Sequence, residues 1–182
     1  MKRLGRYYPL WLELILVYLV FLSFWYPVTH YAEMPPRIPT HFGASGQPDA
    51  WADKSWAAVL TVPLILAAVY AGLTGLAGYM AGVKDPKKLI NASPKQLEKI
   101  TPEKAEAIRR TVIRFLTGEK SLLVAMLSYL SYAETMTALG RWAGLGWVAW
   151  LFVAALVGSS AFLTTYVLGQ VYSAGSPSRR RT

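Results

Sequence analysis

The segment MPPRIPTHFGASGQPDAWADKS, residues 34–55, separates two long apolar segments and sets the interpretation of the whole chain. A regular helix is not expected here, because prolines remove backbone donors and glycines weaken helices. These residues are Pro35, Pro36, Pro39, Pro48, Gly43 and Gly46. The same segment carries His41, Asp49, Trp51, Asp53 and Lys54. A connection between two helices needs only a few polar residues, so the segment is predicted to be a functional loop.

The composition indicates a membrane protein. Of the 182 residues, 54% are hydrophobic and only 16% are charged, whereas about 25% of a soluble domain is charged. Four apolar segments reach the roughly 20 residues with which a helix crosses a bilayer; they are residues 8–28, 56–82, 111–139 and 145–172. The first is too long for a signal peptide and is expected to be retained. We therefore predict an all-α integral membrane protein with four transmembrane helices and an ordered loop between the first two.

The basic residues predict the orientation of the chain in the membrane. The formal net charge is +9, and most of the basic side chains lie before the first apolar segment, between the second and third, and after the fourth. Only Arg37, Lys54 and Arg141 lie in the other two loops. Cytoplasmic loops are enriched in lysine and arginine, so both termini and residues 83–110 are expected in the cytoplasm. The net positive charge is therefore explained by the orientation of the chain in the membrane and by attraction to anionic lipids. No nucleic-acid partner is expected.

Four parts are predicted. They are residues 1–82, with the outer loop at 30–55; a basic cytoplasmic loop at 83–110; two further helices at 111–175; and a basic tail at 176–182. In the cytoplasmic loop, Ser93 and Gln96 are spaced as in a capping box, with Pro94 at the first helical position, and Thr101-Pro102 repeats the signal. We expect one short helix and an amphipathic lead-in to the third membrane helix. This loop either lies on anionic headgroups or binds a cytoplasmic regulator or a larger membrane complex.

Aromatic residues gather at the ends of the apolar segments, which is typical of amphipathic rings that lie at the depth of the lipid headgroups. Tyr7, Tyr8 and Trp11 are expected to mark the inner end of the first helix in this way. Glu13 follows within the apolar segment. It is expected to pair with a basic residue such as Arg6 or one from the cytoplasmic loop.

The outer loop contains the residues best suited to chemistry. His41 lies between a Pro-Thr pair and a phenylalanine, where a mere connection would not need an imidazole. Gly43 and Gly46 are expected to adopt positive φ and let the chain reverse. Either Asp53 or Ser55 is expected to cap the following helix.

The pattern P-x-x-I-P-T-H-F-G-x-x-G-x-P-D-x-W-x-x-K, from Pro35 to Lys54, resembles the signature of a bacterial membrane domain of unknown function. That domain begins the SdpI-type immunity and signalling proteins. The matching positions are Pro39, His41, Gly46, Pro48, Asp49, Trp51 and Lys54. The resemblance implies a multi-pass protein of the prokaryotic inner (cell) membrane. It also implies protection against a secreted toxic peptide and signalling through a membrane-tethered regulator.

Glu134 is an ionisable residue near the outer end of the third apolar segment. Such a residue is costly in lipid and usually faces a partner or a cavity, so Glu134 is expected beneath the His41 loop. One alternative is an ion pair with Lys54 or Arg141. Another is a site for zinc or a similar ion, with His30, His41 and Glu134 as candidate ligands.

Three functions follow from these features. The favoured one is a sensor or immunity protein that recognises a peptide, lipid or small ligand on its outer face. Its predicted binding residues are Pro39, Thr40, His41, Gly46, Asp49, Trp51, Lys54 and Glu134. The second is an accessory subunit of a larger transporter or enzyme. Gly78 and Gly82 form a G-x-x-x-G pair on which helices, including a second copy, can pack. The third is a metal-dependent membrane hydrolase, but no nucleophile or metalloprotease motif supports an enzyme, and no cofactor is predicted.

Overall fold

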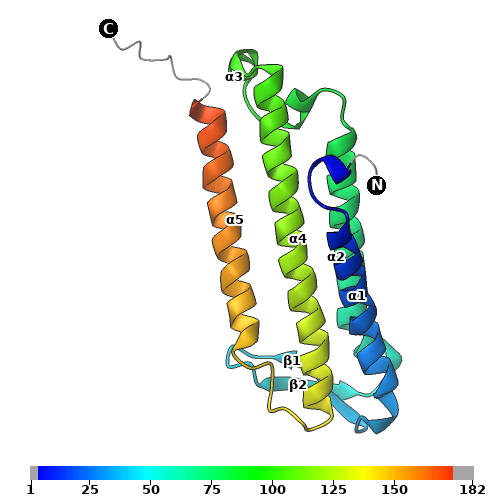
Figure 1. Cartoon of the computed structure of the whole chain (residues 1–182). Coiled ribbons are helices and arrows are strands. Elements are labelled where there is room, and N and C mark those ends of the chain that lie inside the picture. Colours follow the sequence, from blue (N-terminus) through cyan, green and yellow to red (C-terminus); the bar gives the residue numbers. More distant parts are fainter. Residues whose placement is uncertain (1–3, 174–182) are drawn as a thin grey trace.

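The computed structural model describes residues 4–173, in which long helices run side by side and a small β-hairpin lies across one end (Figure 1). The helices are α1 (Trp11–Thr29), α2 (Trp56–Gly82), α3 (Pro94–Lys99), α4 (Pro102–Ala138) and α5 (Val148–Ser173). The strands are β1 (Arg37–Phe42) and β2 (Pro48–Asp53), and 3₁₀ turns are η1 (Leu4–Arg6), η2 (Tyr31–Glu33) and η3 (Pro86–Leu89). The predicted basic tail at 176–182 lies outside the described residues.

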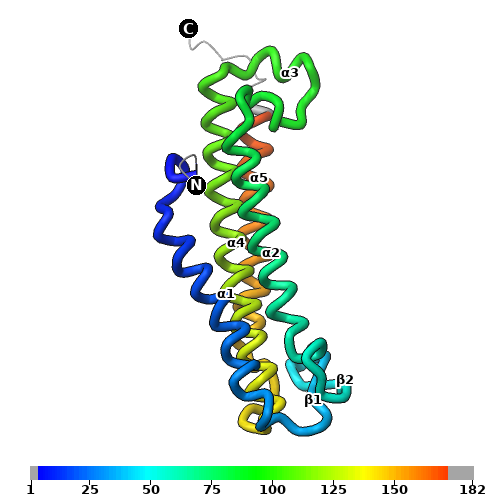
Figure 2. The backbone as a smooth tube through the Cα atoms, turned by 90° about the vertical axis from the view of Figure 1, so that its right-hand side faces the viewer, coloured from blue at the N-terminus to red at the C-terminus, as the bar shows by residue number. Residues whose placement is uncertain are grey.

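Helix α4 is the centre of the bundle. It packs against α1, α2 and α5, and the hairpin lies near its C-terminal end (Figure 2). Its buried side chains include the polar Thr117, Lys120, Ser131 and Thr135. A helix with neighbours on several sides can bury polar groups, because those neighbours supply hydrogen-bond partners.

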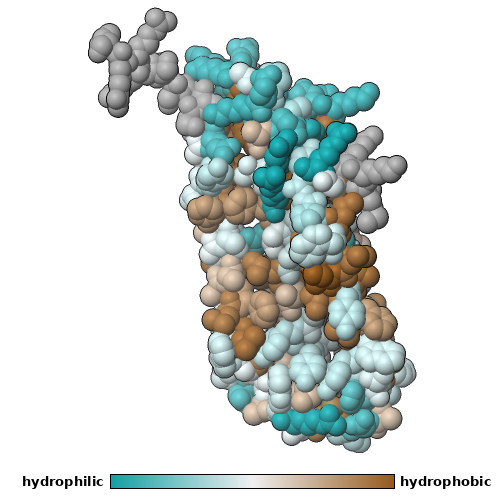
Figure 3. Space-filling view, in the orientation of Figure 1, coloured by the Kyte–Doolittle hydropathy of each residue, from teal (hydrophilic) through white to brown (hydrophobic). Residues whose placement is uncertain are grey.

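Three helices, α1, α2 and α5, are long and apolar enough to cross a membrane, which indicates a multi-pass membrane protein. Four such segments were expected, and α4 is not among the three. Its composition is more polar because charged residues are frequent in its first half, between Glu103 and Lys120. On the face shown in Figure 3, the most apolar residues gather toward the middle of the molecule, and the most hydrophilic ones lie toward its two ends.

The prediction that the chain is all-α is wrong for the outer loop, which forms an antiparallel hairpin. Arg37 pairs with Asp53, and the register becomes irregular beyond Pro39. The chain reverses at Gly46, which has φ of +76° as expected, whereas Gly43 does not have positive φ. Gly43 is instead close to Asp49: a Cβ there would lie 2.8 Å from a carboxylate oxygen, so the Asp49 side chain would have to shift. Prolines in this segment are compatible with strands because a two-stranded hairpin has only edge strands.

A small apolar core attaches the hairpin to the helices. Met34 and Ile38 are buried against Val59 of α2 and Ala138 of α4. Both side chains come from the entry into β1, so the start of the hairpin is fixed to two helices at once. The burial of these side chains determines which face of the hairpin lies toward the bundle.

The helix starts expected in the 83–110 segment are confirmed. Ser93 and Gln96 form the capping box of α3, and the Thr101 hydroxyl accepts a hydrogen bond from the backbone N–H of Lys104. At the start of α2 the capping residue is Ser55, whose hydroxyl accepts from the N–H of Ala58. Local hydrogen bonds of this kind depend on a few neighbouring residues, which is why sequence patterns predict them well.

The structure corrects one expectation about the helix surfaces and narrows one open alternative. Tyr7 and Tyr8 are buried inside the protein, so the headgroup interpretation is wrong for this pair, whereas Trp11 is exposed. On α2, a Cβ added at Gly72, Gly75 or Gly78 would meet no atom within 4 Å. These glycines therefore do not pack inside the bundle.

Candidate functional site

A hollow of about 230 Å³ lies between the hairpin and the helices. Thr40, His41 and Phe42 of β1 line one side, and Glu134 of α4 contributes a carboxyl group. The remaining lining residues are Val62, Leu130 and Leu145. We call this hollow the hairpin pocket. It brings together two residues that lie far apart in the sequence, His41 and Glu134.

Glu134 faces a largely apolar environment. A second hollow of about 10 Å³, lined by Met34, Ile38 and Pro39 among others, also touches Glu134, and it has room for about one water molecule. Within residues 4–173, the Glu134 carboxylate has no ion-pair partner. A carboxyl group without a partner in an apolar hollow is stabilised either by protonation or by an incoming cation or hydrogen-bond donor.

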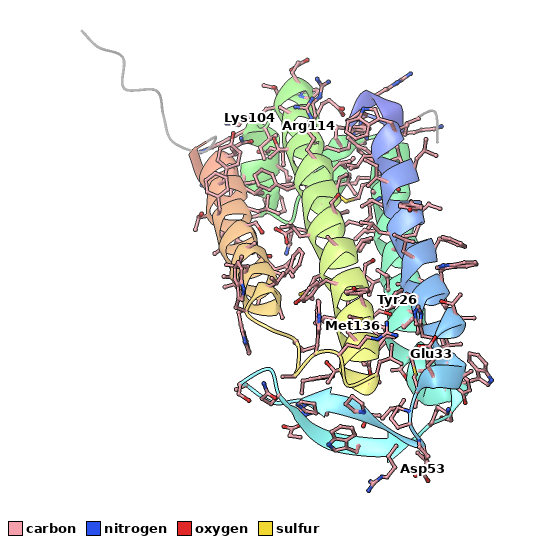
Figure 4. The ribbon with its side chains drawn as sticks, turned by 60° about the horizontal axis from the view of Figure 1, so that its bottom comes forward. Tyr26, Glu33, Asp53, Lys104, Arg114 and Met136 are labelled. Atoms are coloured by element: carbon pink, nitrogen blue, oxygen red, sulfur yellow. The ribbon has the colours of Figure 1, made fainter. Side chains whose placement is uncertain are left out.

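The ion pair expected between Glu134 and either Lys54 or Arg141 is not formed. Arg141 instead contacts Glu33, with 3.1 Å between Nη2 and Oε2. Figure 4 shows Glu33 and Asp53 at the hairpin end, and Tyr26 beside Met136, whose sulfur accepts a hydrogen bond from the tyrosine hydroxyl at 3.1 Å.

His41 makes a short contact across the hairpin. Its Nδ1 lies 2.5 Å from Oδ1 of Asp49, and both side chains are more than half exposed. Because Asp49 belongs to β2, the pair joins the two strands and holds the imidazole at the rim of the hairpin pocket. Gly43 provides the space for this carboxylate, since a side chain there would collide with it.

Lys54 fixes the base of the hairpin. Its Nζ donates hydrogen bonds to the backbone oxygens of Met34 at 2.7 Å and Tyr31 at 3.3 Å, and it lies 5.0 Å from the centre of the Tyr31 ring. Lys54 therefore links the end of β2 to the segment that precedes β1.

Replacing Lys54 with methionine is expected to loosen the hairpin, because two carbonyl oxygens lose a charged donor. The expected loss is about 1–3 kcal/mol in the free energy of local opening. Faster hydrogen–deuterium exchange of residues 34–54 in the purified variant would reveal it. Exchange unchanged from the parent protein would show that the hairpin is held without Lys54.

The other predicted site residues have different surroundings. Pro39 is buried beside Glu134 in the smaller hollow, and Gly46 forms the tip of the hairpin. Trp51 is 48% exposed and does not line the hairpin pocket. His30 contacts Thr29 and the backbone oxygen of Tyr26.

The metal-site hypothesis receives no support from this arrangement. In the part of the chain that the structure describes, no group of three or more His, Cys, Asp or Glu residues could hold an ion. His41 and Glu134 share a pocket, but His30 is held elsewhere by Tyr26 and does not join them.

One polar cluster was missed by sequence reasoning. Lys120 of α4 donates to Glu13 of α1 at 2.6 Å and to Thr74 of α2 at 3.1 Å. Hydroxyl groups of Tyr8 and Tyr70 donate to the same carboxylate at 2.6 and 2.8 Å. The signal in the sequence is that Glu13 and Lys120 both carry charge within apolar segments, at 8–28 and 111–139.

The comparisons with known proteins concern the hairpin and its two flanking helices. Residues 18–67 match a family described as "Domain of unknown function (DUF1648)". No curated protein and no solved structure matches the chain. The match spans the second half of α1, the hairpin and the first half of α2. The chain therefore contains a DUF1648 domain at residues 18–67.

Proposed function

We propose that this protein recognises a ligand on the outer face of a prokaryotic cell membrane, as a sensor or immunity protein of the SdpI type. The observation that carries the proposal is the hairpin pocket, which places the unpaired Glu134 among apolar side chains beneath an ordered loop. The resemblance of the loop to SdpI-type proteins supports the same function. Sites for small ligands are commonly concave and apolar, with a few placed polar groups.

We further propose that α4 crosses the membrane with α1, α2 and α5, with both chain termini in the cytoplasm. Its 37 residues exceed the length needed to span the bilayer, which is about 20 residues. The polar groups of its buried face meet other helices, and the basic residues of the 83–110 segment lie at the opposite end from the hairpin (Figure 1). This arrangement satisfies the positive-inside rule.

The pocket favours a ligand that has an apolar body and one cationic group. The apolar part would contact Phe42, Val62 and Leu130, and the cation would lie against Glu134. A peptide with a basic side chain has this chemistry. His41, held by Asp49, borders the entrance and could donate a further hydrogen bond.

The substitution Glu134→Gln tests this proposal. A short leucine–lysine peptide is the probe, and the same peptide with acetylated amines is its neutral counterpart. The charged peptide should bind the purified protein at least about tenfold more weakly after the substitution, because a charge-assisted hydrogen bond is lost. Tryptophan fluorescence can follow the titration, because Trp142 and Trp147 flank the loop residue Leu145.

Glu98→Gln is the matched control, because it removes an exposed carboxylate at the other end of the molecule. Equal binding of the charged and acetylated peptides, or equal binding by Glu134→Gln and the parent protein, would contradict recognition through Glu134.

A second function is favoured by the surface of α2. Gly72, Gly75 and Gly78 face open space, and small residues allow a helix of another protein to approach closely in lipid. We propose accessory-subunit assembly through this face as the alternative. A failure of the peptide test, combined with a partner protein that co-purifies with the chain, would favour this alternative.

A further inference from the structure

A hollow of about 510 Å³ lies at the end of the molecule opposite the hairpin, where η1, the end of α2 and the first turns of α4 meet. Four of its lining residues are basic: Arg6, Lys84, Arg109 and Arg110. One lining residue, Glu106, is acidic. We call this hollow the basic pocket. It takes no part in the ligand recognition proposed above.

The acidic residue of the basic pocket is already neutralised. Glu106 forms an ion pair with Arg109 and accepts a hydrogen bond from the Tyr7 hydroxyl at 3.4 Å. Among residues 4–173, Arg6, Lys84 and Arg110 have no ion-pair partner. Three positive charges therefore surround the hollow without compensation from the protein, which favours an anion there.

Arg109 has an unused donor at the same place. Its Nη1 donates to the backbone oxygen of Val83 at 2.5 Å, which fixes the guanidinium group between α2 and α4. Its Nε is buried and has no hydrogen-bond partner in the part of the chain that the structure describes. Buried donors without a partner are uncommon and costly, and this one belongs to a residue that lines the basic pocket.

The basic pocket lies at the depth of lipid headgroups. The apolar helix α1 begins at Trp11 and the apolar helix α2 ends at Gly82, and both ends adjoin the residues that line the pocket. The surrounding surface is hydrophilic at this end (Figure 3), where Lys104 and Arg114 also lie (Figure 4). Lipid phosphates occupy the same level, and basic pockets between membrane helices are suited to anionic headgroups.

We propose that the basic pocket binds the phosphate group of an anionic membrane lipid. Arg6, Lys84 and Arg110 supply the attraction, and Arg109 supplies a hydrogen bond from a guanidinium that the protein already holds in place. The acyl chains of this lipid would extend along the apolar surfaces of α1 and α2.

The test compares two double variants of the full chain, purified in detergent and titrated with phosphatidylglycerol, with bound lipid counted by native mass spectrometry. Lys84→Gln/Arg110→Gln should raise the dissociation constant about 30-fold, because each basic residue near an anionic lipid contributes roughly a factor of five. Lys88→Gln/Lys95→Gln removes the same charge from exposed positions outside the pocket, and little change is expected.

Two further measurements keep the test decisive. Arg110→Lys preserves the positive charge and should therefore still bind the lipid. A loss of binding in this variant would indicate misfolding rather than the loss of a charge. Inorganic phosphate, titrated into the parent protein, should not displace the lipid. If the two double variants weakened lipid binding equally, the attraction would be a diffuse property of the basic surface, and the proposed site in the basic pocket would be wrong. Displacement of the lipid by inorganic phosphate would contradict the proposal, because it would show that the basic pocket prefers a soluble anion.

Discussion

Replacing Lys120 with methionine is expected to destabilise the protein by about 3–5 kcal/mol, because it leaves a buried carboxylate without its cation. Lys120 is 1% exposed and Glu13 is 4% exposed, so water cannot solvate the remaining charge. The 2.6 Å contact between Nζ of Lys120 and Oε1 of Glu13 joins α4 to α1, and the bond to Thr74 adds α2. The substitution therefore removes one polar link common to three helices.

The measurement is the temperature or denaturant midpoint of unfolding in detergent, with Lys95→Met as the control. Lys95 is exposed in α3, and its replacement should leave the midpoint nearly unchanged. An equal midpoint for the Lys120 and Lys95 variants would show that the buried pair does not hold the bundle together.

A double variant separates the charge from the packing. In Glu13→Gln/Lys120→Met no charge remains buried. Tyr8 and Tyr70 donate to different oxygens of Glu13, so one hydroxyl can still donate to the glutamine oxygen and the other can accept from its amide group. Much of the stability lost in Lys120→Met should therefore return. Failure to recover would mean that the methionine side chain does not fit, whatever the charge.

Replacing Gly144 with alanine is expected to separate the hairpin from the helices. Gly144 lies in the loop between α4 and α5, and a Cβ there would overlap the backbone oxygen of Gly46 at the hairpin tip. The same oxygen accepts a hydrogen bond from the N–H of Leu145 at 2.9 Å. Because the obstacle is backbone rather than a flexible side chain, the contact has to break, at a cost of about 1–3 kcal/mol.

Hydrogen–deuterium exchange should show the separation as faster exchange across residues 37–53, while the helices remain protected. The matched control is Gly158→Ala in α5, where a Cβ would meet no atom within 4 Å. Peptide binding should also weaken in the Gly144 variant, since Leu145 lines the hairpin pocket. Unchanged exchange in the hairpin would show that the tip contact does not hold it.

The loop at residues 34–55 illustrates what sequence reasoning found and missed. Its prolines and glycines located an ordered loop, and Gly46 was correctly expected to reverse the chain. The strands were missed because their residues do not alternate cleanly between polar and apolar, and two prolines lie within them. The hairpin forms because Met34 and Ile38 are buried on α2 and α4, which a single segment does not reveal.

Sequence alone determined the features that depend on neighbouring residues: the apolar segments that form α1, α2 and α5, the helix caps at Ser93 and Thr101, and the position of the loop at residues 34–55. It left the cap of α2 open between Asp53 and Ser55 and counted residues 111–139 as a fourth span. Only the tertiary structure decided which distant side chains meet. Glu13 and Lys120 are 107 residues apart, and His41 and Glu134 share a pocket only because the hairpin lies across α4. The physical reason is that composition and periodicity act along one segment, whereas these contacts depend on how each helix is rotated against its neighbours.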